Sequence, residues 1–236
     1  MRTLLMIGVL SIFAGQLTAT LSAEDQKLPR VLLLGDSISI GYTPYVQEMM
    51  KDEAVVIRPM GKPNPKTGKT RPENCAGTNN GVKQIDRWLK IDGGNWDVIH
   101  FNFGLHDLKR VQADSGQNSN NPDDPRQAEL EDYEKQLREI TKKLQATGAK
   151  LIFATTTPVP EGGVKPHRDP EDVERYNAVA KKIVREAGGS VNDLYSFALP
   201  RLEKIQRPVN VHFTPEGSQQ LAAQVVTHLR AAIRDK

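Results

Sequence analysis

The sequence predicts a doubly wound α/β sandwich, a three-layer fold in which about five parallel strands are covered by helices on both faces. Two observations support this prediction. Short apolar runs alternate with amphipathic stretches along the chain, and the long irregular segments come directly after apolar runs. Such runs are typical of buried parallel strands, and the loops at the carboxyl ends of these strands are where this kind of fold holds its site.

The N-terminal residues predict export. Arg2 gives a basic start, residues 4–17 are apolar or small apart from Gln16, and Leu21-Ser22-Ala23 precedes two acidic residues. This is the pattern of a cleavable signal peptide, and the apolar run is short for a membrane span. We therefore expect a signal peptide over 1–23, one domain over 24–236, and a secreted or periplasmic protein with no stable membrane insertion after cleavage.

Each expected strand is a short apolar run, and each expected helix spaces its apolar residues at intervals of three and four. The first strand, 31–34, is four aliphatic residues followed by glycine. The helix over 79–89 places Val82, Ile85 and Leu89 on one face. The same patterns predict strands over 54–57, 97–103, 151–154 and 191–194. They predict further helices over 43–52, 130–144, 172–187 and 215–233.

Composition excludes several classes of protein. The 32 basic and 29 acidic residues nearly balance, and no run of Lys or Arg forms a stripe, so a nucleic-acid partner is not expected. The single cysteine, Cys75, allows no internal disulfide and no thiolate zinc site. The histidines and carboxylates also lack metal-ligand spacing, so neither a metal nor another cofactor is predicted.

A candidate nucleophile stands directly after the first strand. Ser37 lies in Gly35-Asp36-Ser37, where glycine permits a sharp turn and serine begins a helix. Its amide then faces the carboxyl edge of the sheet with the helix dipole behind it, so Ser37 could be both nucleophile and oxyanion donor. Serine is also a preferred N-cap residue, so this motif alone supports either interpretation.

A candidate general base lies far along the chain. His212 precedes Thr214 and Pro215, a good N-cap and a good first residue for the last helix. The histidine is therefore expected on a loop, where its imidazole could take the proton of Ser37 and return it to a leaving alcohol.

Three blocks of the sequence resemble the SGNH (GDSL-type) hydrolase family, and the resemblance covers nearly all of the mature chain. The blocks are LLGDSIS at 33–39, DVIHFNFGLHD at 97–107 and VHFTPEG at 211–217. The resemblance implies a flavodoxin-like SGNH-hydrolase fold, in agreement with the predicted sandwich. It also implies a serine esterase without a cofactor, in which Ser37 is the nucleophile and His212 the base.

Two positions depart from the family pattern. His106 stands where the family has the Asn that completes the oxyanion hole, and we predict that its imidazole N–H takes that role. Val209 stands where the family has the Asp that orients the catalytic histidine. The Val209 carbonyl, the Asn210 side chain or the distant Asp193 could orient the imidazole instead; we favour a Ser–His dyad helped by the backbone carbonyl.

The resemblance further implies a backbone amide from the family's second block in the oxyanion hole. The matching stretch is PENCAGTNNG at 72–81. Spacing back from Gly81 selects Cys75, whereas residue type selects Gly77, so either amide is a candidate donor.

The expected activity is hydrolysis of carboxylic esters. Exported members of the family resemble enzymes that remove acetyl groups from polysaccharides, and the loops at 61–75 and 114–125 are polar and poor in aromatic residues. This favours a small ester or acetylated carbohydrate as substrate. The alternatives are a lipase or lysophospholipase, and a non-catalytic glycan-binding module on a decayed hydrolase scaffold.

Overall fold

The fold is built on one parallel sheet, as the apolar runs predict. The computed structural model describes residues 27–235, and its five strands lie in the order β2-β1-β3-β4-β5. This is the strand order of flavodoxin-like sheets. The strands are β1 Arg30–Leu34, β2 Val55–Ile57, β3 Val98–Phe101, β4 Lys150–Ala154 and β5 Ser190–Asn192.

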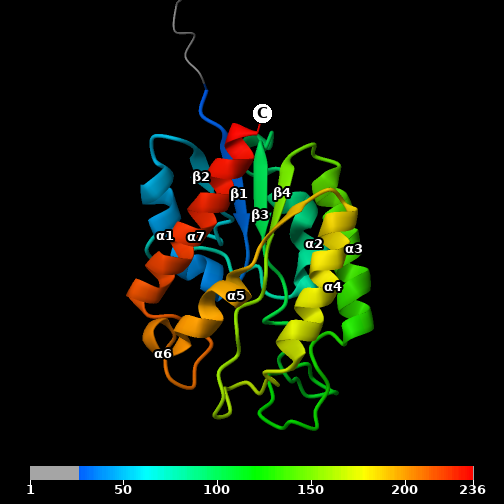
Figure 1. The fold of residues 1–236 in the computed structure, drawn as a ribbon. Helices are drawn as coiled ribbons and strands as arrows, with labels where there is room; N and C mark the ends of the chain where they lie inside the picture. The colour runs from blue at the N-terminus through cyan, green and yellow to red at the C-terminus, as the bar shows by residue number, and fades with distance from the viewer. Residues whose placement is uncertain (1–26, 236) are drawn as a thin grey trace, which may run out of the picture.

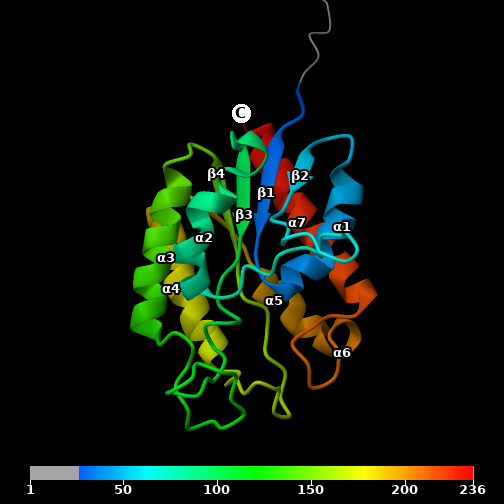
Figure 2. The same ribbon diagram turned by 180° about the vertical axis from the view of Figure 1, so that it is seen from behind.

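Helices cover both faces of this sheet. Helices α1 and α7 lie on one face, and α2, α3 and α4 lie on the other (Figures 1 and 2). The short helices α5 and α6 lie below the sheet in Figure 1, on the side of α7. The helices are α1 Ser37–Met50, α2 Thr78–Trp88, α3 Leu130–Gln145, α4 Asp172–Glu186, α5 Leu194–Ala198, α6 Leu202–Ile205 and α7 Pro215–Arg234.

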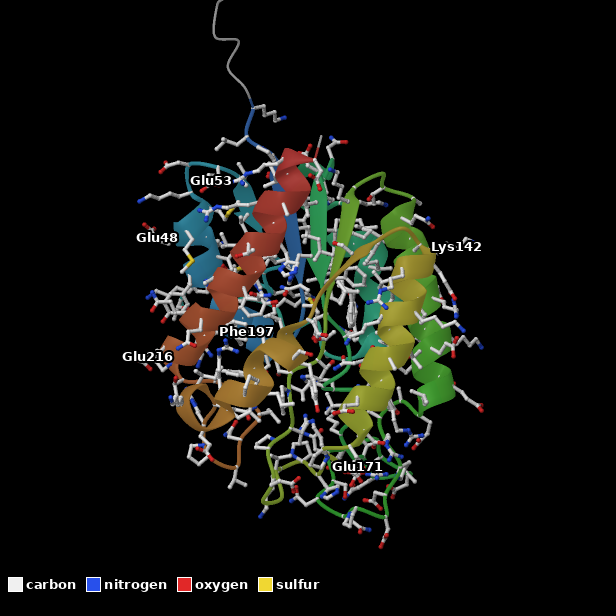
Figure 3. All side chains as sticks on the ribbon, in the orientation of Figure 1. Glu48, Glu53, Lys142, Glu171, Phe197 and Glu216 are labelled. Carbon is white, nitrogen blue, oxygen red and sulfur yellow. The ribbon has the colours of Figure 1, made fainter. Side chains whose placement is uncertain are left out.

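The sheet is buried on both faces, which is why its strands read as continuous apolar runs rather than alternating ones. Val31 to Leu34 in β1 are fully buried. The aromatic residues Trp88, Trp96, Tyr133 and Tyr176 are buried as well. Charged side chains such as Glu48, Lys142 and Glu216 instead lie on the outer faces of α1, α3 and α7 (Figure 3).

Two expectations about elements need correction. The helix expected over 43–52 begins at Ser37 and contains Pro44; its first turn is capped by the Asp36 side chain, so the proline does not mark a helix start. The strand expected over 191–194 ends at Asn192 because the Asp193 side chain accepts the Ser196 amide and begins α5.

The predicted signal peptide over 1–23 lies outside the described residues and stays a prediction, as does the domain boundary after it. Within residues 27–235, no helix is both long and apolar enough to cross a membrane.

Candidate active site

The fold brings the ends of β1 and β3 together at the edge where the chain leaves the sheet. The connection after β1 leads to α1 on one face, and the connection after β3 leads to α3 on the other face (Figure 1). Such a reversal opens a crevice at the carboxyl ends of the strands. Ser37 follows β1 there and His106 follows β3.

A tight turn presents Ser37. A Cβ on Gly35 would lie 2.7 Å from the Cβ of Ser39, so the turn admits no larger residue without movement. The Asp36 carboxylate accepts the Ile38 amide at 2.9 Å and fixes the start of α1. Ser37 is thereby held at the first position of the helix, with the positive end of the helix dipole at its own amide.

A buried arginine supports this turn from behind, and the sequence motifs did not reveal it. Arg58 is 4% exposed and donates to the Ser39 and Thr43 hydroxyls at 3.1 and 2.9 Å. It also donates to the carbonyls of Gly35 and Glu73 at 3.3 and 2.8 Å. The guanidinium therefore ties the nucleophile turn to the loop that precedes α2.

The structure joins the two residues at the centre of the sequence prediction. The His212 Nε2 lies 2.9 Å from the Ser37 Oγ, across 175 positions of sequence. The loop that carries the histidine is held in place by Gln206, whose amide donates to the Pro158 and Val211 carbonyls at 2.9 and 3.3 Å. The Thr214 hydroxyl then caps α7 by accepting the Gly217 amide, as the sequence predicts.

The group that orients His212 is not the favoured Val209 carbonyl but the Asn210 side chain. Asn210 Oδ1 lies 2.8 Å from the imidazole Nδ1 and also accepts the His212 backbone N–H at 2.9 Å. Because the oxygen is already turned toward an N–H donor, it accepts the Nδ1 proton as well. Nε2 is then unprotonated and can accept the proton of Ser37.

Asp193, the other alternative for that role, is engaged elsewhere. Its carboxylate pairs with Lys181 at 2.7 Å, accepts the Thr155 hydroxyl at 3.0 Å and caps α5. Val209 has a positive φ of 49° and is exposed. A carboxylate in direct contact with His212 is absent from the ion pairs and hydrogen bonds of residues 27–235.

Burial and nearby cations keep His212 neutral. Burial is the largest influence and lowers the imidazole pKa below its ordinary value of 6.5. The Asp36 carboxylate raises that pKa, and the guanidinium groups of Arg207 and Arg168 lower it. An imidazole that is neutral at pH 7 can act as a general base.

His106 shares this electrostatic environment. Burial lowers its pKa too; Asp36 again raises it, while Lys109, Arg168 and His212 lower it. The imidazole is therefore neutral and has one N–H to donate. The sequence prediction of an oxyanion donor requires this proton to face the substrate.

The two candidate amides of the second block differ in what they contact. The Cys75 amide donates to the Gly35 carbonyl at 3.1 Å, so it is already engaged. Among the hydrogen bonds of residues 27–235, none uses the Gly77 amide as donor. Burial raises the pKa of the Cys75 thiol to about 12, so this sulfur is protonated and is not a competing nucleophile.

Asp107 connects the second and third blocks. Its carboxylate accepts the backbone amide and the hydroxyl of Thr78 at 2.8 and 2.6 Å. Burial raises the pKa of this carboxyl to about 6. The contact holds the start of α2, and with it Gly77, against the turn that contains His106.

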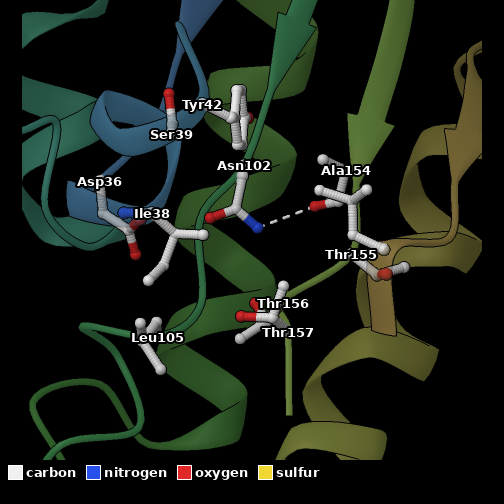
Figure 4. A pocket seen from close by; sticks show the side chains of 11 residues that line it. Asp36, Ile38, Ser39, Tyr42, Asn102, Leu105, Ala154, Thr155, Thr156 and Thr157 are labelled. Atoms are coloured by element: carbon white, nitrogen blue, oxygen red, sulfur yellow. Dashed lines mark hydrogen bonds between the residues drawn. The ribbon is translucent and has the colours of Figure 1, made fainter. Parts of the chain in front are cut away.

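Two hollows flank the Ser37 turn. A water-sized cavity of about 10 Å³ lies behind it, where the Asn102 side chain donates to the Ala154 carbonyl (Figure 4). An open hollow of about 270 Å³ lies in front and contains both Ser37 and His212. Only the second has room for a substrate group. Its lining residues are Ser37, Ile38, Gly41, Tyr45, Arg207, His212, Phe213, Pro215 and Ser218.

Within residues 27–235, no three His, Cys, Asp or Glu residues are grouped so that they could hold a metal ion. The arrangement at the open hollow is a serine hydroxyl hydrogen-bonded to a neutral imidazole whose tautomer is fixed by an amide, which is the arrangement of an activated serine nucleophile.

Comparison with known families agrees with this geometry. The model of the GDSL-like lipase/acylhydrolase family matches residues 33–220, which include the turn of Ser37 and the loop of His212. The chain belongs to this family. The family is one of carboxylic ester hydrolases, so the protein is a GDSL-family hydrolase of ester bonds.

Solved structures of similar fold have low sequence identity to this hydrolase. A lipase/acylhydrolase from Enterococcus faecalis has 19% identity and a TM-score of 0.65, and the match covers 86% of this chain and 96% of that one. An acetylxylan esterase from Geobacillus stearothermophilus has 16% identity and a TM-score of 0.60, with 85% and 94% covered. A carbohydrate esterase family 3 protein from Talaromyces cellulolyticus has 18% identity and a TM-score of 0.60, with 89% and 100% covered. No curated protein sequence matches the chain significantly.

Proposed function

We propose that this GDSL-family hydrolase is an exported esterase that removes acetyl groups from carbohydrate, with Ser37 as nucleophile and His212 as general base. The observation that carries the proposal is the 2.9 Å contact between Ser37 Oγ, at the start of a helix, and His212 Nε2. The sequence pattern over 1–23 supports export to the periplasm or the exterior.

The proposed reaction has two halves. Ser37 Oγ forms a bond to the acyl carbon as its proton passes to His212 Nε2, and that proton then leaves with the sugar alkoxide as the ester C–O bond breaks. In the second half a water molecule gives its proton to the same Nε2 and attacks the acyl carbon. Acetate leaves, and the proton returns to Ser37.

We assign the developing oxyanion to three donors. The Ser37 amide has the dipole of α1 behind it, the Gly77 amide has no acceptor among the described residues, and His106 is neutral with one N–H. Preorganised donors of this kind stabilise a tetrahedral intermediate strongly because they need no reorganisation.

The size of the open hollow supports a small acyl group on a polar alcohol. Its volume of about 270 Å³ lies just below the roughly 300–1,000 Å³ found for small-molecule sites. Its lining mixes polar and apolar side chains and provides no long apolar channel of the kind that a fatty acyl chain would require.

Labelling with a fluorophosphonate tests the nucleophile. The wild-type protein should be modified at Ser37, and Ser37→Ala should not be modified; Ser39→Ala is the matched control and should still react. Absence of labelling in a folded wild-type protein would instead favour a non-catalytic glycan-binding module.

Acyl-chain length tests the substrate class. We expect kcat/KM for 4-nitrophenyl acetate to exceed that for the octanoate and laurate esters, and acetylated oligosaccharides to release acetate. A preference for the long-chain esters would support the lipase or lysophospholipase alternative.

A further inference from the structure

Arg207 is a cationic residue in the lining of the open hollow that contains Ser37 and His212. Arg207 follows α6, and its backbone N–H donates to the His212 carbonyl at 2.9 Å, so the residue is anchored to the histidine loop. Its side chain is exposed and lines the hollow that contains Ser37 and His212. With His212 neutral, Arg207 is the one residue in that lining that carries a charge at neutral pH.

The Arg207 guanidinium has no ion-pair or hydrogen-bond partner among residues 27–235. Among the ion pairs and side-chain hydrogen bonds of residues 27–235, none involves the Arg207 side chain, although most other arginines have one. Its five N–H donors therefore face solvent or a ligand. A planar fork of donors binds a carboxylate or another oxyanion in two parallel hydrogen bonds.

The same residue borders a second hollow. Arg207 also lines a depression of about 320 Å³ with Pro160, Leu202, Glu203 and Val209. The two hollows therefore share this residue in their linings.

A second arginine adds to the positive charge at the site. Arg168 is 6% exposed and donates to the Leu105 and Pro166 carbonyls at 2.7 and 3.1 Å, and it has no carboxylate partner among the described residues. Burying a guanidinium without a counter-ion is costly, so such a group is expected where a negative charge is to be bound or developed. The one carboxylate that acts on both histidines, Asp36, is used as the cap of α1.

We propose that Arg207 binds an anionic group on the alcohol part of the substrate, so that the esterase acts on acetylated acidic sugars such as uronic acids. This inference rests on the proposed function and adds the substrate class to it. The acetyl ester would lie at Ser37, the sugar ring in the open hollow, and its carboxylate against the exposed guanidinium.

An isosteric pair of substrates tests the charge directly. Acetate release is measured from acetylated galacturonic acid and from its neutral C6 amide, which has the same size and ring. We expect kcat/KM for the acid to exceed that for the amide by about tenfold or more, which corresponds to one charge-assisted hydrogen bond. The preference should shrink with added salt, since the guanidinium is exposed. The ratio of kcat/KM for acetylated galactose 6-sulfate to that for acetylated galactose shows whether a sulfate is accepted in place of the carboxylate.

Variants then assign the preference to the residue. Arg207→Gln should bring the ratio of acid to amide close to one, and Arg207→Glu should invert it. Arg185→Gln is the matched control, because Arg185 is an exposed arginine on α4 that lines neither hollow. It should leave the ratio unchanged. A ratio near one in the wild-type protein, or a ratio that survives Arg207→Gln, overturns the proposal.

Failure of this inference is distinguishable from failure of the proposed function. A protein that is labelled at Ser37 and releases acetate equally from the acid and the amide is an esterase without the proposed charge selection. A protein that is not labelled at Ser37 and releases no acetate refutes both the proposed function and the charge selection by Arg207. A further readout is the acid limb of the pH profile with 4-nitrophenyl acetate, which should move to higher pH in Arg207→Gln because a cation near His212 is removed.

Discussion

Asn210 orients His212 without supplying a charge. Its amide oxygen fixes the tautomer at Nδ1, but a neutral oxygen stabilises the imidazolium formed during the reaction less than a carboxylate would. The residue therefore meets the geometric requirement of a catalytic triad and leaves the electrostatic one to the surroundings of the histidine.

Exchange of Asn210 for Asp should make this difference measurable. The new carboxylate would favour the imidazolium, so the His212 pKa should rise. Because the base acts in its neutral form, the acid limb of kcat/KM should move to higher pH, and kcat above that limb should increase. Asn210→Ala should lower kcat/KM by about tenfold or more, since the imidazole loses its orienting partner. Asp193→Asn is the control and should retain most activity; an unchanged limb in Asn210→Asp would argue against the assigned contact.

His106 is the second residue whose role can be measured. We expect His106→Ala to reduce kcat by about 100-fold or more, because removal of one oxyanion donor typically costs that much. His106→Asn should restore much of the rate, since an amide can donate from a similar place. A loss below about tenfold, measured with 4-nitrophenyl acetate, would assign His106 to structure rather than catalysis.

At the scale of elements, the contact between α6 and α7 sets the position of the histidine loop. A Cβ on Gly217 would lie 2.1 Å from the Ile205 carbonyl oxygen, which already accepts the Thr214 amide. No side chain can enter there unless the two helices separate, and the loop between them carries His212. The close approach of backbone to backbone is thus a condition for the contact between Ser37 and His212.

Gly217→Ala should therefore lower both stability and activity. We expect a loss in the free energy of unfolding of about 2 kcal/mol, within the range seen for overpacking, and a larger proportional loss of kcat/KM. Gly41→Ala is the matched helical control: its Cβ would meet only the flexible Ser218 hydroxyl, at 3.2 Å. Its stability should change by less than about 1 kcal/mol. Chemical denaturation measures the free energy of unfolding of both variants. An equal loss of stability in the two would contradict the argument.

For the whole molecule, buried histidine makes stability depend on pH. His100 in β3 is fully buried beside Asn192 and against the edge of Tyr42, and burial lowers its pKa to about 3. Between pH 6.5 and about 3 the unfolded chain binds a proton that the folded chain does not, so stability is lost as the pH falls through this range. The pKa of Asp107 is raised to about 6, so between pH 6 and about 4 the folded chain binds a proton that the unfolded chain does not. This group therefore adds stability as the pH falls through that range and partly offsets the effect of His100.

The prediction is a steep fall in melting temperature below pH 6. His100→Gln keeps a polar contact to Asn192 without a titrating group, so its melting temperature should fall less between pH 7 and pH 4.5 than that of the wild-type protein. His228→Gln removes the second group that lowers the His100 pKa, so its melting temperature should also fall somewhat less than that of the wild type. Parallel curves for His100→Gln and wild type would show that His100 does not cause the acid sensitivity.

Much of this protein follows from its sequence because the determining patterns are local. Apolar runs such as 31–34 predict buried strands, and the Gly35 turn and the Thr214 cap predict where Ser37 and His212 lie relative to their helices. The family blocks add the pairing of these two residues, whose side chains lie 2.9 Å apart in the structure. These features depend on neighbours within a few positions, so periodicity and capping suffice to predict them.

Only the tertiary structure shows which charged and polar groups lie near Ser37 and His212. Arg58, Arg168 and Arg207 come from three separate loops, and no local pattern distinguishes them from surface arginines. The choice of Asn210 over the Val209 carbonyl is a matter of which oxygen faces the imidazole, which depends on a backbone turn at positive φ rather than on spacing. The charge at a site and the orientation of its groups depend on elements that are distant in sequence. Only the packed fold brings those elements within a few ångströms of one another.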